Sequence, residues 1–142
     1  VSTSARGVGF EDGSLKTPLG LHRIAARFGE GVPRGTIFRA RANSGQIAEI
    51  LTEPGARSPR ENITSRILWL EGLEPGINRG GSVDSQQRYI YIHGTDEEGR
   101  IGEPASQGCV RMRNDDVIEL FPVLPVGTPV TILEGEEVRD LS

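Results

Sequence analysis

Several residue types are scarce in this chain of 142 residues, and each scarcity excludes a class of protein. A single cysteine rules out an internal disulfide, although it leaves the cellular compartment open. The two histidines and the cysteine show no CxxC or HxxxH spacing, so the usual zinc patterns are missing. Lys16 is the only lysine, and the other cations are arginines spread along the sequence.

Long apolar runs and an excess of positive charge are also missing. No segment is long and apolar enough to span a bilayer, and no signal peptide is visible. The net charge is −4 at pH 7, whereas nucleic-acid-binding domains normally present a basic surface. We therefore expect neither a membrane-spanning segment nor a nucleic-acid partner.

Glycine and proline are abundant, with 19 and 9 residues, beside a hydrophobic fraction of 35%. This composition and the short β-branched runs predict a β-rich domain with many turns, formed as a single domain over residues 1–142. Residues 43–50 are ambiguous, because their Ala and Gln residues allow a helical turn. Because the chain begins with Val1 instead of Met, we expect a processed or cut start. The predicted strands cover residues 19–28, 36–42, 63–70, 88–94 and 128–133.

The 63–70 strand (ITSRILWL) is predicted to be central, because apolar residues occupy both of its faces. Trp69 in this strand could pack in the core or line a substrate groove, and core packing is favoured. His22, in the first strand, is interpreted as structural. The Gly-rich connection 72–87 is either a mobile flap over a site or an exposed hairpin loop without a catalytic role.

The most informative stretch is residues 89–119, which hold the cysteine and one histidine. The run RYIYIHG predicts a strand that ends at His93, with Tyr89, Tyr91 and His93 on one face. A polar loop over residues 95–104 then returns the chain to the end of this strand. Asn114 is a good N-cap for a short helix whose apolar stripe is Val117, Leu120 and Phe121.

This arrangement suits acyl transfer from a peptide or amide. An imidazole such as His93 can take the proton of the Cys109 thiol and later return it to a leaving amine. Gly108 leaves the backbone open, so the N–H groups of Gly108 and Cys109 could bind an oxyanion. Two alternatives remain open on the residues alone. Cys109 could be an ordinary buried hydrophobe, or it could bind zinc with His93 and a carboxylate.

The segment IHGTDEEGRIGEPASQGCVRM resembles the active-site signature of the L,D-transpeptidase catalytic domain, the YkuD family. In that family a His-Gly pair is followed, after a loop, by Ser-His-Gly-Cys, a hydrophobic residue and Arg or Asn. His93 and Gly94 match the pair, and residues 106–111 (SQGCVR) match the rest except at Gln107, where histidine is usual. Residues 16–24 (KTPLGLHRI) are similar to an upstream Thr-Pro-x-Gly-x-x-x-Ile run of the family.

The resemblance implies a mainly β, mixed-sheet L,D-transpeptidase-like fold with one short helix after the active-site cysteine. The family's first strands would be missing from this chain, which would leave a sheet edge unprotected. No cofactor and no metal are implied.

The resemblance also implies a reaction and the residues that carry it. Cys109 would attack a peptidoglycan stem tetrapeptide, release D-alanine and hold the rest as a thioester. His93 would be base and then acid, with the Gly94 carbonyl orienting its ring. The oxyanion hole would be formed by N–H groups of Gly108, Cys109 and Gln107. The implied substrate contacts are Ser106 and Arg111.

Several outcomes stay open within this resemblance. The acceptor could be the amine of a neighbouring stem, a lipoprotein lysine, or water, which would make the protein an L,D-carboxypeptidase. A non-catalytic peptidoglycan-binding module is the alternative of a different class, and a general cysteine peptidase is a third. A cell-wall role in the cell envelope, periplasmic or otherwise outside the cytoplasmic membrane, is implied by the family alone.

Overall fold

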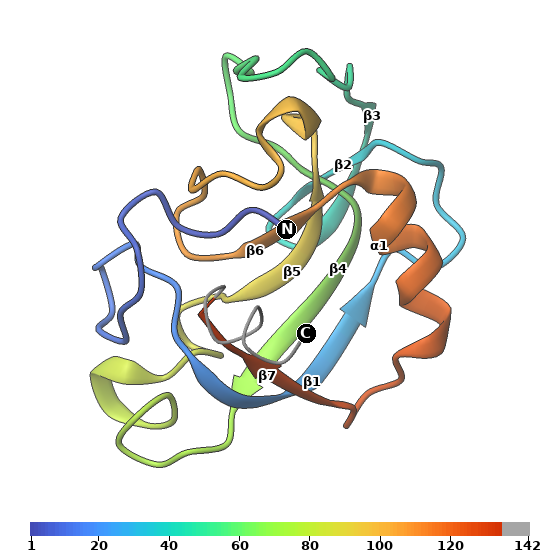
Figure 1. Ribbon diagram of the computed structural model, residues 1–142. Helices are drawn as coiled ribbons and strands as arrows, with labels where there is room; N and C mark the ends of the chain where they lie inside the picture. Colours follow the sequence, from blue (N-terminus) through green and yellow to red (C-terminus); the bar gives the residue numbers. More distant parts are fainter. Residues whose placement is uncertain (135–142) are drawn as a thin grey trace, which may run out of the picture.

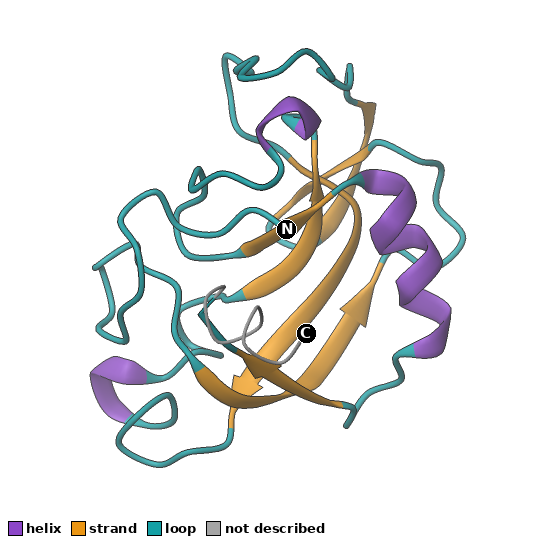
Figure 2. Ribbon diagram, in the orientation of Figure 1, coloured by secondary structure: helices purple, strands orange, loops and turns teal. Residues whose placement is uncertain are grey.

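The computed structural model describes residues 1–134, which form a seven-stranded sheet with one short α-helix (Figures 1 and 2). The strands are β1 (Gly20–Phe28), β2 (Thr36–Arg39), β3 (Ala42–Ile47), β4 (Ile63–Gly72), β5 (Tyr91–Thr95), β6 (Val110–Met112) and β7 (Pro129–Ile132). The helix is α1 (Asn114–Leu120), and short 3-10 turns cover Gly81–Val83, Glu98–Arg100 and Phe121–Val123.

The strand order confirms the predicted mixed sheet. Hydrogen-bonded neighbours follow the order β3, β2, β4, β1 and β7. Outside this order, β5 pairs with the edge of β4 that β1 and β2 leave open. All these pairings are antiparallel, whereas β5 and β6 run parallel. A parallel pair needs a crossover, and the long loop between His93 and Cys109 supplies it. The mainly β fold with one short helix is therefore confirmed.

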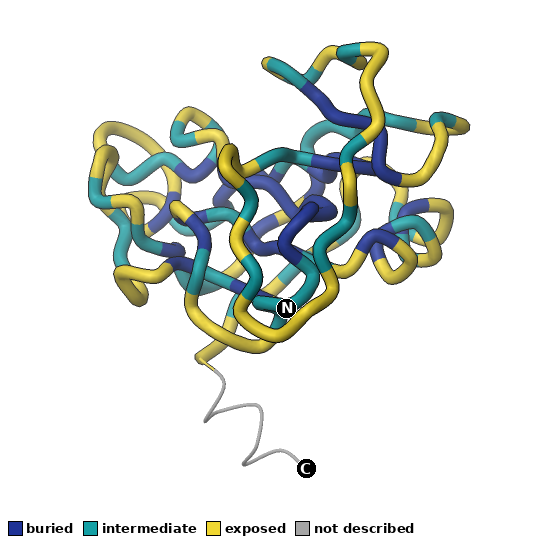
Figure 3. The backbone as a smooth tube through the Cα atoms, turned by 90° about the horizontal axis from the view of Figure 1, so that it is seen from above, coloured by how far each residue is buried: buried dark blue, intermediate teal, exposed yellow. Residues whose placement is uncertain are grey.

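The strand β4 is central, as its two apolar faces predict. It pairs with β1 and β2 along one edge and with β5 along the other. Leu68 and Leu70 belong to one buried cluster with Ile24, while Ile67 belongs to a second cluster on the opposite face. Figure 3 shows the buried residues gathered along the middle of the molecule, with exposed loops around them. Because both faces of β4 are buried, the register of β4 is fixed, and β5 pairs with this strand.

The start of α1 differs from the expectation. Arg113 occupies the N-cap position, and Asn114 is the first helical residue. The helix is capped from elsewhere, because the Glu98 carboxylate accepts the backbone N–H of Asn114 at 2.8 Å. The Asn114 side chain is thereby free to bind the sheet: its Oδ1 accepts Thr64 Oγ1 at 2.6 Å, and its Nδ2 donates to the Thr95 carbonyl at 2.8 Å.

The predicted strand 36–42 is confirmed for Thr36–Arg39, and its last residues are wrong. The chain reverses at Ala40 and Arg41, and β3 returns antiparallel to β2. In the ambiguous segment 43–50, ladder hydrogen bonds to β2 therefore take the place of a helical turn. The strand predicted to begin at residue 88 begins at Tyr91, because Tyr89 has a positive φ of 57° and lies in a turn.

The connection 72–87 packs against β1 as a bonded loop. Asn78 is fully buried and its Nδ2 donates to the Leu19 carbonyl at 3.1 Å. His22 is also fully buried, with Nε2 2.8 Å from the Ser85 hydroxyl. These contacts agree with a structural role for His22, and they attach the connection near its middle and near its end to the segment that forms β1.

The expectation of an unprotected edge is wrong for β6. Ser2 pairs antiparallel with Arg111, and Ser4 pairs with Ser106, so the first residues cover this edge. Figure 1 shows the N-terminus beside β6. Within residues 1–134, no helix is long and apolar enough to cross a membrane.

Candidate active site

The sulfur of Cys109 is held by the backbone at the start of β5. Its thiol donates to the Tyr89 carbonyl at 3.4 Å and accepts the N–H of Tyr91 at 3.4 Å. The residue is half-buried and packs against the cluster of Phe38, Ile67 and Tyr91. The thiol is therefore fixed in place at the margin of the core.

The pairing of β5 with β6 brings the segments of His93 and Cys109 together. His93 is the partner of Arg111 across β5 and β6, and Cys109 lies just before β6. Tyr91, two residues before His93 in β5, donates its N–H to the sulfur of Cys109. His93 Nδ1 donates to the Gly94 carbonyl at 2.5 Å, which leaves Nε2 as the proton acceptor.

Glycine at position 94 is required by a close approach of other groups. A Cβ there would lie 2.6 Å from both Asn114 Oδ1 and the Thr64 carbonyl oxygen. Any side chain would displace the strand end whose carbonyl holds His93. The His-Gly pair of the sequence thus has a local physical reason.

Burial keeps both reacting groups neutral near pH 7. Burial lowers the pKa of His93 to about 4, and the nearby charge of Arg111 lowers it further, while the hydrogen bond to Gly94 acts in the opposite direction. Burial raises the pKa of Cys109 to about 11, and the Glu61 carboxylate adds to this shift. The Tyr91 N–H and the charges of Arg88 and Arg111 oppose it. The resting site is a thiol beside a neutral imidazole.

The turn that carries the predicted oxyanion donors is shaped by Ser106 and Thr17. Gly108 has a φ of 119°, and a Cβ there would lie 3.2 Å from the Lys16 carbonyl oxygen. Its N–H donates to Ser106 Oγ at 3.3 Å, and Ser106 in turn donates to the Cys109 carbonyl at 2.6 Å. One of the three predicted donors is therefore already bonded within the chain.

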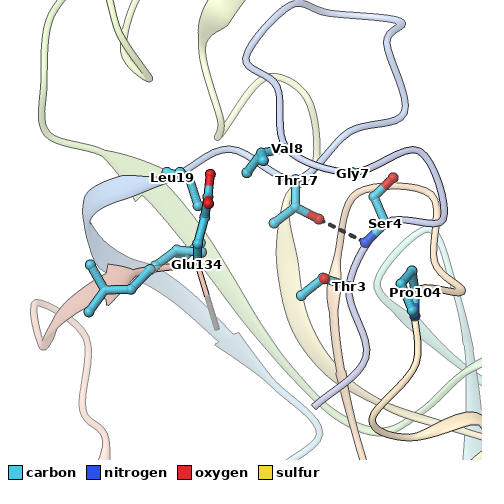
Figure 4. Close-up of a pocket in the computed structure, with 10 residues that line it drawn as sticks. Thr3, Ser4, Gly7, Val8, Thr17, Leu19, Pro104 and Glu134 are labelled. Carbon is cyan, nitrogen blue, oxygen red and sulfur yellow. Dashed lines mark hydrogen bonds between the residues drawn. The ribbon is translucent and has the colours of Figure 1, made fainter. Parts of the chain in front are cut away.

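Thr17 connects the upstream segment 16–24 with the turn before Cys109, although the two are far apart in sequence. Its hydroxyl donates to the Gly108 carbonyl at 3.0 Å and accepts the N–H of Ser4 at 3.0 Å. Figure 4 shows the second of these bonds at the wall of a cavity of about 390 Å³. The lining of this cavity contains neither His93 nor Cys109. The upstream segment therefore supports the active-site turn from behind.

The structure buries two residues that were expected at the substrate surface. Ser106 is 3% exposed, and Arg111 is fully buried. The Arg111 guanidinium donates to Glu97 at 2.7 Å and to Glu61 at 3.1 Å. Arg111 thus lies in a buried ion pair, and a substrate carboxylate would have to displace these partners to make the expected contact. Gln107 is exposed.

Two residues near the thiol were missed by the sequence reasoning. Arg88 donates to the Lys16 carbonyl at 2.6 Å, and its charge favours the thiolate of Cys109. It stands at the start of the run RYIYIHG, where it was interpreted as an ordinary strand residue. Arg41 donates to the Tyr91 hydroxyl at 3.0 Å from the β2–β3 turn. No local pattern connects that turn with the cysteine.

An open groove of about 530 Å³ is lined by Trp69, Gln86, Gln87 and Tyr89, and its lining contains neither His93 nor Cys109. Tyr89 connects the groove with the thiol, because its carbonyl accepts the Cys109 thiol. Trp69 also packs against the core cluster, which was the favoured role for it. Among the described residues, no group of three histidine, cysteine or acidic side chains is arranged to hold a metal ion.

The sequence model of YkuD, the L,D-transpeptidase catalytic domain, matches residues 2–132, and the chain belongs to this family.

Individual proteins named as L,D-transpeptidases are similar to this chain over a shorter stretch. YqjB of Bacillus subtilis (strain 168), named as an L,D-transpeptidase, is 51% identical over 47 residues, which are 33% of this chain and 27% of that protein. YkuD of the same organism is 54% identical over 48 residues, 34% of this chain and 29% of that protein. ErfK/SrfK of Escherichia coli (strain K12) is 51% identical over 47 residues, 33% and 15% of the two chains. The matched segment spans less than a third of each relative.

Proposed function

We propose that this chain is a peptidoglycan L,D-transpeptidase that acts through a thioester on Cys109. The observation that carries the proposal is that β5 bonds both groups: the N–H of Tyr91 donates to the sulfur of Cys109, and two residues later the Gly94 carbonyl holds His93 Nδ1. A fixed imidazole with a free Nε2 beside a thiol is the arrangement that nucleophilic acyl transfer needs. Membership of the YkuD family supplies the substrate class.

The first half-reaction acylates the enzyme. Cys109 Sγ attacks the carbonyl of the third residue of a stem tetrapeptide while His93 Nε2 takes the thiol proton. The N–H of Cys109, with those of Gln107 and Gly108, binds the oxyanion, and Gly108 must first release Ser106. His93 then gives its proton to the leaving D-alanine amine, the C–N bond breaks, and the thioester remains.

The second half-reaction returns the enzyme to its resting state. The amine of a neighbouring stem attacks the thioester and gives a cross-link, with His93 again taking the proton. A lipoprotein lysine in place of that amine would anchor the lipoprotein to the wall. These substrates place the protein in the cell envelope, outside the cytoplasmic membrane.

The neutral resting pair determines when the proton moves. With the pKa of Cys109 raised to about 11 and that of His93 lowered to about 4, an ion pair is disfavoured before substrate binds. Proton transfer therefore accompanies the attack on the carbonyl, when the developing oxyanion is stabilised. The charges of Arg88 and Arg111 favour the thiolate at that moment.

Two other outcomes stay distinct from this proposal. Water as the acceptor would make the protein an L,D-carboxypeptidase. The protonated, half-buried thiol is the observation that favours a non-catalytic peptidoglycan-binding module.

Product analysis separates the three. The purified protein and its Cys109→Ala variant are incubated with a disaccharide tetrapeptide, and the products are separated by mass. Released D-alanine and a cross-linked dimer, both absent with the variant, are expected. Tripeptide without dimer would indicate the carboxypeptidase. Binding of the muropeptide by both proteins without release of D-alanine would indicate the binding module and overturn the enzyme.

A further inference from the structure

The guanidinium of Arg41 lies over the rings of Trp69 and Tyr89, two of the residues that line the open groove. Its carbon is 4.8 Å from the centroid of the Trp69 ring and 5.4 Å from that of Tyr89. One nitrogen donates to the Tyr91 hydroxyl at 3.0 Å. Three aromatic residues thus position one cation, and two of them also hold the sulfur of Cys109 through their backbones.

The backbone beneath Arg41 is unusual for its side chains. Ala40 and Arg41 form the two-residue turn between β2 and β3, with φ values of 47° and 67°. Turns with two positive φ values normally use Asn-Gly or Gly-Gly, because side chains are disfavoured there. Tyr89, at the other side of the groove, also has a positive φ, 57°. Such conformations gather at functional sites, where the side chain is needed in that place.

Arg41 also has N–H donors beyond the one that bonds the Tyr91 hydroxyl. Within residues 1–134 it forms no ion pair, whereas Arg23, Arg34, Arg100 and Arg111 each pair with a carboxylate. A guanidinium has five N–H donors in a planar fork that matches a carboxylate, and stacking on a ring fixes the direction of the fork. The free side of Arg41 is therefore suited to a carboxylate supplied by a ligand.

We propose that Arg41, stacked on Trp69 and Tyr89, is the subsite for the terminal carboxylate of the leaving D-alanine. The inference rests on the proposed function, because it takes the donor tetrapeptide as the substrate. That carboxylate is the anionic group nearest to the scissile carbonyl, one residue away. Arg41 is likewise separated from the thiol by a single side chain, that of Tyr91. The pairing would select donors that end in a free acid.

The binding test uses a protein that cannot turn over. In the Cys109→Ala protein, the emission of Trp69, the only tryptophan, is followed during titration with a tetrapeptide ending in D-alanine or in D-alaninamide. The acid is expected to bind about tenfold more tightly than the amide, as for a charge-assisted hydrogen bond. Adding Arg41→Gln removes this preference, and adding Arg41→Lys retains part of it.

A matched control comes from the same hairpin. Arg39 is two residues away, but its guanidinium donates to Asn62 at 3.2 Å, so Arg39→Gln removes the same charge without touching the groove. It is expected to keep the full preference for the acid. Thermal unfolding shows whether each variant is folded. Equal affinity for acid and amide in the starting protein, or a preference that survives Arg41→Gln, would overturn the subsite.

Acylation by the two peptides separates this inference from the proposed function. With Cys109 intact, thioester formation is expected to be about tenfold faster with the acid, and Arg41→Gln equalises the two rates. Absence of any thioester would refute the proposed function, while the titration would still decide the subsite. Equal acylation rates for the two peptides would overturn the subsite and leave the transpeptidase standing.

Discussion

His93 Nδ1 lies 2.5 Å from the carbonyl oxygen of Gly94, the next residue of the same strand. The bond fixes the proton on Nδ1 and leaves Nε2 as the acceptor. Because burial keeps this imidazole neutral, with a pKa of about 4, it is a base at every pH above that value. The Cys109 thiol, which accepts the N–H of Tyr91 in the same strand, therefore controls the pH dependence of the proposed site.

The alkylation rate of Cys109 should rise steeply with pH. An acid whose pKa is raised to about 11 stays protonated below that pH. At pH 7 only about one molecule in ten thousand would hold a thiolate, so the rate should grow about tenfold per pH unit. Intact mass after timed exposure to iodoacetamide measures it. Free cysteine is the control and should level off near its ordinary pKa. A plateau already present below pH 7 would indicate a thiolate–imidazolium pair instead.

Replacing Asn114 should destabilise the junction of α1 with the sheet. Its amide accepts two hydroxyls, from Thr64 and Ser65, and donates to the Thr95 carbonyl. Asn114→Ala leaves these buried groups without partners, at an expected loss of about 2–4 kcal/mol in the free energy of unfolding. Urea denaturation measures this loss.

Asn43→Ala is the control for that variant. Asn43 is exposed in β3, and its side-chain Oδ1 accepts the Gly45 N–H at 2.8 Å. We expect a loss of at most about 1 kcal/mol. Equal losses for the two variants would contradict the buried network at Asn114.

The Arg111–Glu97 pair should be coupled in stability. Burial raises the pKa of Glu97, but the hydrogen bonds from Arg111 and the Ser58 N–H, together with the charges of Arg111 and Arg100, outweigh it and hold the pKa below its ordinary value. Arg111→Met leaves that carboxylate buried without its cation, which typically costs about 3–5 kcal/mol. The double variant Arg111→Met, Glu97→Gln should regain part of the loss. A double-mutant cycle by denaturant unfolding measures the coupling, and additive losses would show that the pair acts independently.

The substitution Gly108→Ala should slow acylation as well as lower the stability of the protein. The new Cβ would lie 3.2 Å from the Lys16 carbonyl oxygen, at a φ of 119°, and would move the turn that carries Cys109. We expect a loss of about 1–3 kcal/mol in stability from the backbone strain and at least a tenfold slower acylation.

Gly45→Ala separates backbone strain from contact. Gly45 also has a positive φ, 79°, but a Cβ there meets nothing within 4 Å. It should cost about 1 kcal/mol and leave acylation unchanged. Slower acylation by both variants would mean that global destabilisation, and not the position of the turn, limits the reaction.

Elements with strong local patterns were predictable from the sequence. The apolar residues on both faces of the 63–70 run identified the central strand, and the His-Gly and Ser-x-Gly-Cys motifs predicted that the segments now seen to pair as β5 and β6 lie close together. The β2–β3 hairpin was missed because its turn is Ala40-Arg41, without the glycine or asparagine that marks such turns. The pairing of Ser2 with Arg111 joins residues 109 positions apart in sequence, and no local pattern predicts it.

Burial and partners at the site were less accessible to sequence reasoning. Arg111 was expected to face a substrate, yet its partners Glu97 and Glu61 are 14 and 50 residues away in sequence. Arg41 approaches Tyr91 across a separation of 50 residues. Such contacts depend on strand order and register, which the sequence pattern of one segment does not contain.

The central claim, a thioester on Cys109, is tested most directly by the intact mass of the protein during reaction. The wild-type chain and its Cys109→Ala variant are mixed with a stem tetrapeptide and quenched in acid at short times. The account predicts an adduct equal to the tetrapeptide less D-alanine on the wild-type chain, sensitive to hydroxylamine and absent from the variant. Release of D-alanine without such an adduct, or an adduct of the same mass on the variant, would contradict it.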